Sequence, residues 1–378
     1  GGFPNSQTGK AELQTAKTPN LDKLASGSSC GLTIPVDYGI TPGSGPAHLS
    51  LFGYNPQKYQ IGRGVLEALG IGLEMEKKDL AARANFSTLD YEKNIITDRR
   101  AGRIATEINI ELCKLLQEKI KKIDDVEIII KPGKGHRFVV LFRGEGLSQD
   151  ITENDPQKEG RQPLKIEPAN KEAEKTATLV NKFLDAVKEI VKDKQPANYA
   201  LMRGFSKYPD IPTMQDIYKL NPAAIATYPM YRGLAQLVGM KVIKTGETLQ
   251  DEIKTLKENY SGFDFFYFHI KATDAAGEDG TFDVKVKKLE EIDAVIPQIL
   301  ELRPDVFIFT GDHSTPAELR GHSWHPVPFL MNSKYNLKDK IKKFSEENCR
   351  SGSLGIFPAE KVMSLAMAGA LKLAKFGA

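Results

Sequence analysis

Residues 306–325, VFIFTGDHSTPAELRGHSWH, form the stretch that decides the fold. The apolar run 306–309 predicts a buried strand, and the Thr-Gly pair after it predicts the end of that strand. Asp312 and His313 then lie at the carboxyl end of a strand, which is where open α/β sheets bind their ligands. With His322 nearby on the same loop, this carboxylate and these imidazoles suit a divalent transition metal such as Zn²⁺ or Mn²⁺. The alternative is a polar loop whose Asp and His cap a helix.

The composition of the chain excludes several classes of protein. With 378 residues, the chain has the length of two domains or of one large domain that carries an insertion. It has no apolar run of about 18 residues, so we expect no membrane-spanning segment. The 52 basic and 49 acidic residues give a net charge of +3, which argues against non-specific nucleic-acid binding. The three cysteines are far apart and are expected to be reduced thiols of a cytoplasmic protein.

Strands and helices alternate along most of the chain, which predicts an α/β fold with helices around a mostly parallel sheet. Residues 78–195 have a different pattern, because strands flank one helix and a polar stretch follows. This pattern predicts a smaller α+β domain inserted into the main one. The expected domains are therefore a core domain of residues 1–77 and 196–378 and an inserted domain of residues 78–195. An amphipathic helix is expected over residues 358–375.

A second acidic cluster follows the predicted strand 263–270. Asp274 lies just past the end of that strand, on the edge from which Asp312 and His313 also emerge. Glu278 follows four positions later, so one helical turn places both carboxylates on the same side. An acidic first turn is the alternative interpretation, because the helix dipole favours it without any ligand. Together with the histidine-containing loop, this cluster favours two metal ions over none.

Neither cluster contains a nucleophile, and the best candidate lies in the loop 41–48, TPGSGPAH. Ser44 is flanked by two glycines, which leave room for a substrate and a metal beside its hydroxyl. A turn that leads into a helix also directs backbone N–H groups at an anion. A serine hydroxyl needs a base or a metal to become a good nucleophile at neutral pH. Loops rich in Gly, Pro and Ser are common, so this signal is weak by itself.

Several arginines are candidates for substrate binding, since arginine can grip phosphate or carboxylate with two hydrogen bonds. Three of them fall within five positions in the expected inserted domain, and two others lie beside His136 or after a strand: Arg99, Arg100, Arg103, Arg137 and Arg203. A solvated surface loop is the alternative for the first three. His136 is the first candidate donor of a proton to a departing hydroxyl and His48 is the second, and a structural role is the alternative for His136.

Longer stretches of the sequence resemble a known family. They include TPNLDKLA, GSGPAHLSLFGYNP, NIITDRRAGRIATE, HIKATDAAG, TGDHSTP and HSWHPVPFL, and they are spread in order over essentially the whole chain. On these motifs the chain resembles the archaeal type of 2,3-bisphosphoglycerate-independent phosphoglycerate mutase, within the alkaline phosphatase superfamily. The resemblance implies an alkaline-phosphatase-like sandwich and the interconversion of 3-phosphoglycerate and 2-phosphoglycerate through a phosphoserine on Ser44. A metal-dependent phosphatase or phosphonate hydrolase on the same fold is the alternative function.

The resemblance also implies two divalent metal ions. One ion would be held by Ser44, Asp312, His313 and an aspartate at the end of the family's first strand. The other ion would be held by Asp274, the residue at position 278 and His322. Position 278 is usually histidine in the family and is Glu278 here. An oxygen ligand there favours a harder ion, so Mn²⁺ is expected, with Mg²⁺, Co²⁺ and Zn²⁺ as alternatives.

The start of the chain departs from the family pattern. The first-strand motif of the family is Asp-Gly-x-Gly, and Gly1 and Gly2 match only its tail. We therefore expect further residues before Gly1 in the natural protein, and we expect Gly1 to lie close to Ser44 and Asp312. The expected partner is a small molecule, phosphoglycerate, with no nucleic acid and no membrane, and the sequence predicts no particular oligomeric state. A non-catalytic scaffold would require every residue of both clusters to be structural.

Overall fold

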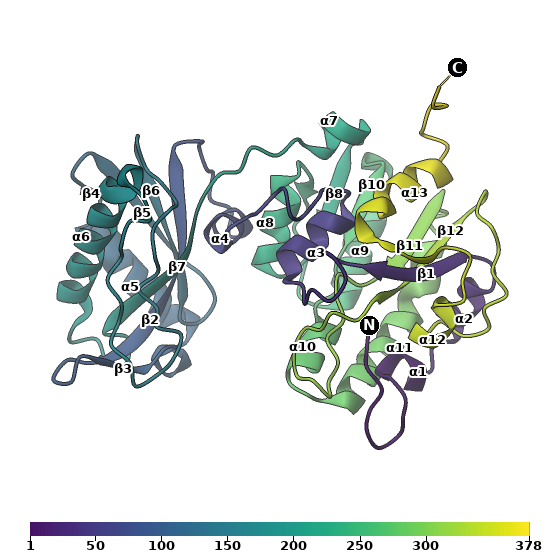
Figure 1. Ribbon diagram of the computed structural model, residues 1–378, viewed down its shortest axis with the longest axis horizontal. Coiled ribbons are helices and arrows are strands. Elements are labelled where there is room, and N and C mark those ends of the chain that lie inside the picture. The colour runs from purple at the N-terminus through teal and green to yellow at the C-terminus, as the bar shows by residue number, and fades with distance from the viewer. Residues whose placement is uncertain (378) are drawn as a thin grey trace. The chain divides into compact units, whose positions relative to one another are not determined.

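The computed structural model describes residues 1–377 and has a mixed α/β fold, as the sequence predicts (Figure 1). Its contacts divide the chain into two units. The first unit contains Gly1–Gln60, Met214–Thr227 and Met240–Ala378, and the second contains Ile61–Thr213 and Tyr228–Gly239. The segment 78–195, which the sequence predicts as an inserted domain, lies wholly within the second unit. Among the described helices, none is both long enough and apolar enough to span a lipid bilayer.

The strands of the first unit form two sheets. They are β1 (Ser29–Ile34), β8 (Pro222–Ile225), β9 (Lys241–Val242), β10 (Phe265–Phe268), β11 (Val306–Thr310), β12 (Val327–Ser333) and β13 (Gly355–Pro358). One sheet has the order β11-β12-β1-β13, in which β12 is antiparallel to β11 and β1 while β13 is parallel to β1. The other has the order β10-β8-β9 and is parallel. The first unit therefore has one mixed and one parallel sheet instead of a single mostly parallel one.

Strand β11 is less buried than the sequence predicts. Every residue of β11 is half-buried, and the same is true of β10. Both are outermost in their sheets, so each has a strand neighbour on one side only within the described chain. The prediction of a fully buried strand over 306–309 is thus wrong in its burial, although the strand itself is present and ends at the expected place.

Helices cover both faces of the mixed sheet. The helices of the first unit are α1 (Glu12–Thr15), α2 (Pro19–Ala25), α3 (Ser44–Leu51), α7 (Met214–Tyr218), α9 (Leu249–Asn259), α10 (Ala272–Glu278), α11 (Phe282–Leu300), α12 (Glu346–Cys349) and α13 (Val362–Gly369). Leu330 of β12 packs in one apolar cluster with residues of α2 and α11. Its neighbours Phe329 and Met331 pack in another cluster with residues of α3 and α13. This alternation follows from the two-residue period of a strand.

The last helix is shorter than the sequence predicts. The expected helix over residues 358–375 is a short 3₁₀ turn followed by α13, which ends at Gly369. Leu371 has a positive φ of 56°, and the N–H of Lys372 donates to the carbonyl of Met367 at 2.9 Å. A left-handed residue with this backward hydrogen bond ends an α-helix, even where the apolar pattern continues.

The second unit is an antiparallel sheet with helices. Its strands are β2 (Asp79–Asp90), β3 (Ile95–Asp98), β4 (Lys122–Ile123), β5 (Val126–Pro132), β6 (Arg137–Arg143) and β7 (Tyr199–Lys207), in the order β3-β2-β6-β5-β4 with β7 also paired to β2. Its helices are α4 (Arg63–Gly70), α5 (Thr106–Lys119), α6 (Glu174–Val191) and α8 (Pro229–Leu237). Alternate residues of β2, from Leu80 to Phe86, pack in one core with α5 and α6. Arg83 lies between them in sequence, so it points to the opposite face.

Candidate functional site

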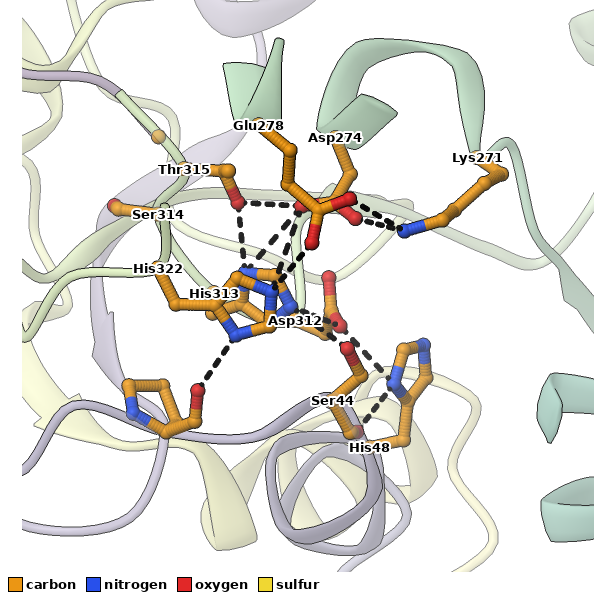
Figure 2. A network of polar contacts seen from close by, with 12 residues as sticks. Ser44, His48, Lys271, Asp274, Glu278, Asp312, His313, Ser314, Thr315 and His322 are labelled. Atoms are coloured by element: carbon orange, nitrogen blue, oxygen red, sulfur yellow. Dashed lines mark hydrogen bonds and ion pairs between the residues drawn. The ribbon is translucent and has the colours of Figure 1, made fainter. Parts of the chain in front are cut away.

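The candidate site of the first unit is assembled from the ends of three elements (Figure 2). Asp312 and His313 directly follow β11, and Asp274 and Glu278 lie on α10, which follows β10. Ser44 is the first residue of α3, so it lies at a helix N-terminus, where backbone N–H groups are directed away from the helix. The site therefore forms where two strands end and one helix begins, as the sequence predicts.

The first group of side chains surrounds Asp312. Its Oδ2 atom is 3.1 Å from His313 Nε2 and 3.2 Å from His48 Nδ1. The Ser44 hydroxyl lies 3.0 Å from the same nitrogen of His313. Burial by itself would raise the pKa of Asp312, but the imidazoles of His48 and His313 hold it far below its usual range. Asp312 Oδ2 is buried and accepts no well-aligned hydrogen bond, so this group fits a bound cation.

The second group contains Asp274, Glu278 and His322. The Nε2 atom of His322 lies 3.9 Å from Asp274 Oδ1 and 3.7 Å from Glu278 Oε1. His322 Nδ1 donates to the carbonyl of Pro42 at 2.8 Å, because a carbonyl can only accept. The other nitrogen of the ring is therefore unprotonated in the neutral imidazole and faces the two carboxylates. Such an arrangement is common for histidines that bind metal ions.

Lys271 gives the second group a positive charge of its own. Its ammonium contacts Asp274 Oδ2 and lies 3.9 Å from Glu278 Oε2. Burial would raise the pKa of Asp274, but hydrogen bonds from Lys271 and Thr315 hold it below its usual value. Asp274 is therefore a carboxylate at neutral pH, and it accepts hydrogen bonds without donating any.

His313 lies between the two groups. Its ring stacks on that of His322 with the centroids 3.6 Å apart, as Figure 2 shows. Ligand atoms of Asp274, His313 and His322 all lie within 4.8 Å of one another, so these three residues could hold a metal ion. Both groups offer oxygen and imidazole ligands, which suit Mn²⁺, Co²⁺ or Zn²⁺.

The structure brings all six predicted metal ligands together in the first unit, namely Ser44, Asp274, Glu278, Asp312, His313 and His322. The sequence interpretation missed the contacts of His48, Lys271 and Thr315. Each has a weak local signal: His48 is four positions after Ser44 on one helix, and the other two lie within three residues of a predicted ligand. Gly1 lies beside the same loop, where its carbonyl accepts hydrogen bonds from Thr315 N–H at 3.4 Å and Lys285 Nζ at 3.2 Å.

The second unit contains a group of arginines. Arg99 makes two hydrogen bonds to Asp155, at 2.9 and 2.6 Å, and Arg203 lies 3.9 Å from the same carboxylate. Arg137 donates to the hydroxyl of Tyr228 at 3.3 Å. The buried Nε atoms of Arg137 and Arg203 have no hydrogen-bond partner in the described chain. Four of the five predicted arginines thus lie near one another or near His136, although Arg100 is exposed, whereas Arg103 is exposed and makes no ion pair in the described chain.

The structure adds Arg83 to this group. It is only 8% exposed, and its Nη1 atom is 3.7 Å from Glu67 Oε1. Its pKa is lowered to about 10, chiefly by burial and also by the charges of Arg137, Arg203 and Arg63, against the opposing charge of Glu67. The sequence signal for Arg83 was its position in the mostly apolar stretch 80–86, LAARANF. This surplus of positive charge, most of it half-buried or buried, suits an anionic ligand.

His136 is uncharged at neutral pH in this environment. Burial lowers its pKa to about 4, and the nearby charges of Arg137, Arg100 and Arg83 act in the same direction. A neutral imidazole is not ready to donate a proton, so the predicted role of His136 as an acid requires a bound anion to raise its pKa.

This shift predicts a pH dependence of stability. The unfolded chain binds a proton on His136 below about pH 6.5, whereas the folded chain does so only near pH 4. As the pH falls through this window, the folded state loses up to about 3 kcal/mol relative to a chain without this histidine. We therefore expect His136→Asn to lose less stability than the parent between pH 7 and 4 in denaturant titrations. If the free energies of unfolding of the two proteins changed with pH in parallel, the lowered pKa of His136 would be contradicted.

Comparisons with known proteins give consistent results. A family profile described as "2,3-bisphosphoglycerate-independent phosphoglycerate mutase" matches residues 25–198. A relative from Thermotoga neapolitana, which bears the same family name, is 58% identical over 370 residues, covering 98% of this chain and 92% of the relative. The solved structure of a protein from Pyrococcus horikoshii has a TM-score of 0.86 at 29% identity and covers 100% of this chain and 96% of that one. The structure of a cofactor-independent phosphoglycerate mutase from Thermoplasma acidophilum has a TM-score of 0.72 at 30% identity, with coverage of 98% and 97%.

Proposed function

Since the chain belongs to the 2,3-bisphosphoglycerate-independent phosphoglycerate mutase family, we propose that it interconverts 3-phosphoglycerate and 2-phosphoglycerate through a phosphoserine on Ser44. The observation that supports this route best is the position of Ser44. Its hydroxyl lies at the N-terminus of α3 and 3.0 Å from His313 Nε2, beside the buried Asp312 carboxylate. We also propose that the fold is of the alkaline phosphatase type and that the protein acts in the cytoplasm, where its three cysteines remain free thiols.

Two divalent ions fit the two groups of side chains. Ser44, Asp312 and His313 would hold one, and Asp274, Glu278 and His322 would hold the other. We favour Mn²⁺, because three carboxylates and a hydroxyl outnumber the imidazoles, and Mg²⁺, Co²⁺ and Zn²⁺ are the alternatives. When bound, such ions favour the deprotonated serine and neutralise phosphoryl charge.

The side chains of the protein then perform two transfers. Ser44 Oγ loses its proton and attacks the phosphorus of 3-phosphoglycerate. The bond between phosphorus and the 3-oxygen breaks, and the 3-oxygen takes up a proton. The N–H groups of Ser44 and Gly45, at the start of α3, would donate to the phosphoryl oxygens, whereas Pro46 has no N–H to offer. The glycerate then turns, and its 2-hydroxyl loses its proton and attacks the phosphorus of the phosphoserine, so that the bond between phosphorus and Ser44 Oγ breaks. Water competes with glycerate at this second step, so the glycerate has to be held tightly.

We propose that the arginines of the second unit hold the substrate. The group consists of Arg99, Arg100, Arg137 and Arg203, which the sequence predicts, together with Arg83. Arginine binds planar carboxylate and phosphate groups with paired hydrogen bonds. The unpartnered Nε atoms of Arg83, Arg137 and Arg203 support this role, because a buried donor without a partner costs about 1–3 kcal/mol. Arg103 is the weakest member of the predicted set, because it is exposed and, unlike the also exposed Arg100, is not among the charges that lower the pKa of His136.

The arginine proposal predicts a specific kinetic change. Replacing Arg137 by methionine removes one positive charge and all five N–H donors but keeps an unbranched, flexible side chain. We expect the KM for phosphoglycerate to rise about tenfold or more, with unchanged metal content. Arg161→Met is the matched control, because Arg161 is exposed in the same unit. An unchanged KM in the Arg137 variant would contradict substrate binding by these arginines and would indicate that their role is structural.

An assay of the whole chain tests the function itself. The protein is stripped of metal with a chelator, and conversion of 3-phosphoglycerate to 2-phosphoglycerate is followed before and after Mn²⁺ is added. We expect no turnover without metal and recovery with Mn²⁺, in the absence of 2,3-bisphosphoglycerate. Release of inorganic phosphate instead of 2-phosphoglycerate would indicate a phosphatase and contradict the proposal.

A further inference from the structure

The hydroxyl of Thr315 lies between the two groups of the site. Its Oγ1 atom is 2.6 Å from Asp274 Oδ1 and 2.9 Å from His313 Nδ1, and Thr315 is only 3% exposed (Figure 2). A hydroxyl has one hydrogen to donate, and an ionised carboxylate can only accept. The hydrogen of Thr315 therefore goes to Asp274. It follows that His313 Nδ1 must carry a hydrogen and donate it to Thr315 Oγ1.

This hydrogen bond determines which nitrogen of His313 is available to a cation. With the hydrogen on Nδ1, the Nε2 atom of the neutral ring has a free lone pair. That atom lies 3.0 Å from Ser44 Oγ and 3.1 Å from Asp312 Oδ2. Two lone-pair acceptors at such a distance repel each other unless a positive group lies between them. The opposite tautomer would direct the lone pair towards Asp274 instead.

The backbone of Thr315 is held firmly from the far side of the site. The buried ammonium of Lys285 donates to the carbonyl of Thr315 at 2.7 Å. Lys285 in turn lies 3.4 Å from the buried carboxylate of Glu12, whose Oε1 atom accepts from the N–H of Ala317 at 2.8 Å. The carbonyl also lies so close to Gly277 of α10 that any Cβ at that position would overlap it. These contacts fix the backbone from which the Thr315 hydroxyl extends.

We propose that Thr315 is a positioning residue that sets the tautomer of His313 and assigns its Nε2 atom to the cation site of Ser44 and Asp312. Asp274 is thereby left to the other site, with Glu278 and His322. The hydroxyl thus separates two sites whose ligand atoms lie close enough to merge around one ion. This inference rests on the proposed function only in its assumption that two ions bind. Partners that orient metal-binding histidines typically change metal affinity by about 10–100-fold when they are removed.

Three variants of the full chain test the proposal. Thr315→Val keeps the shape of the side chain but removes the hydroxyl, and Thr315→Ser keeps the hydroxyl. Thr33→Val is the matched control, because Thr33 of β1 is fully buried and its hydroxyl donates to the carbonyl of Val327, away from the site. The tautomers are measured in metal-free protein by ¹⁵N spectra of the imidazole rings, of which the chain has only six. Mn²⁺ binding is measured separately by titration.

We expect the Nδ1–H form of His313 in the parent, the Thr315→Ser variant and the Thr33→Val control, and its loss in Thr315→Val. We also expect Thr315→Val to bind Mn²⁺ about 10–100-fold more weakly, with serine restoring the affinity. An unchanged tautomer in Thr315→Val would overturn the proposal, and so would a serine variant that behaves like valine. Because the tautomer is read without metal or substrate, it decides this proposal independently of mutase activity. A parent without mutase activity would instead contradict the proposed function.

Discussion

Ser44→Ala is expected to lower phosphoglycerate interconversion by about a thousandfold or more, because it removes the atom that accepts the phosphoryl group. The free energy of unfolding should change by only about 0.5 kcal/mol, since Ser44 is half-buried at a helix start and its side chain packs little. The measurement is the rate of 2-phosphoglycerate formation with Mn²⁺ at saturating substrate. Mass spectrometry of the rapidly quenched protein should also show one added phosphoryl group in the parent and none in the variant.

The control for this experiment is Ser50→Ala. Ser50 lies on the same helix α3 and is 2% exposed, so the substitution makes the same chemical change away from the candidate ligands. We expect it to retain nearly all of the activity. If Ser44→Ala kept more than a few per cent of the parent's activity, or if it still acquired the phosphoryl group, Ser44 would not be the nucleophile.

Asp312→Asn is the second change with a large expected effect. Asparagine keeps the shape of the side chain but removes the charge that balances a dication, so we expect metal binding to the Ser44 group to weaken and activity to fall by about a hundredfold or more. The neighbouring imidazoles of His48 and His313 hold the pKa of Asp312 low against the effect of burial, so the parent carries this charge at any working pH. The measurements are metal content after dialysis and turnover with added Mn²⁺.

Two further variants make this test selective. Asp283→Asn removes the same charge from an exposed position on α11 and should leave metal content unchanged. His322→Ala removes a ligand of the other group, so it should lower metal content through a different ion. Parent-like metal content in both Asp312→Asn and His322→Ala would show that the assignment of two sites is wrong.

Much of the candidate site could be predicted from local sequence patterns. The apolar runs before Asp274 and Asp312 predict strands, and the polar residues after them then lie at strand ends. Ser44 between glycines predicts a loop that leads into a helix, and α3 begins at that residue. The family resemblance, which the comparisons confirm, joined these local signals into one activity. Each of these inferences depends on residues that are close together in the chain.

Other features depend on contacts between distant residues. Arg83 joins Arg137 and Arg203 only because β2, β6 and β7 pair side by side, and the pattern of one strand does not show which strands flank it. The burial of β11 was overestimated for the same reason, since an apolar run does not reveal whether a strand lies at the edge of its sheet. The end of α13 depends on the left-handed backbone at Leu371, against a helical apolar pattern.

The chain's own sequence thus determined which residues can carry the chemistry, because strand periods, helix starts and motif spacing are local properties of the polypeptide. The division of those residues into two groups came from the family resemblance, and the tertiary structure decided which of their atoms face one another. Thr315 meets Asp274 across 41 positions of sequence, and His313 meets Ser44 across 269. The direction of each hydrogen bond depends on atomic positions set by the packing of whole elements, here of α3, α10 and the loop after β11. No local pattern contains that information.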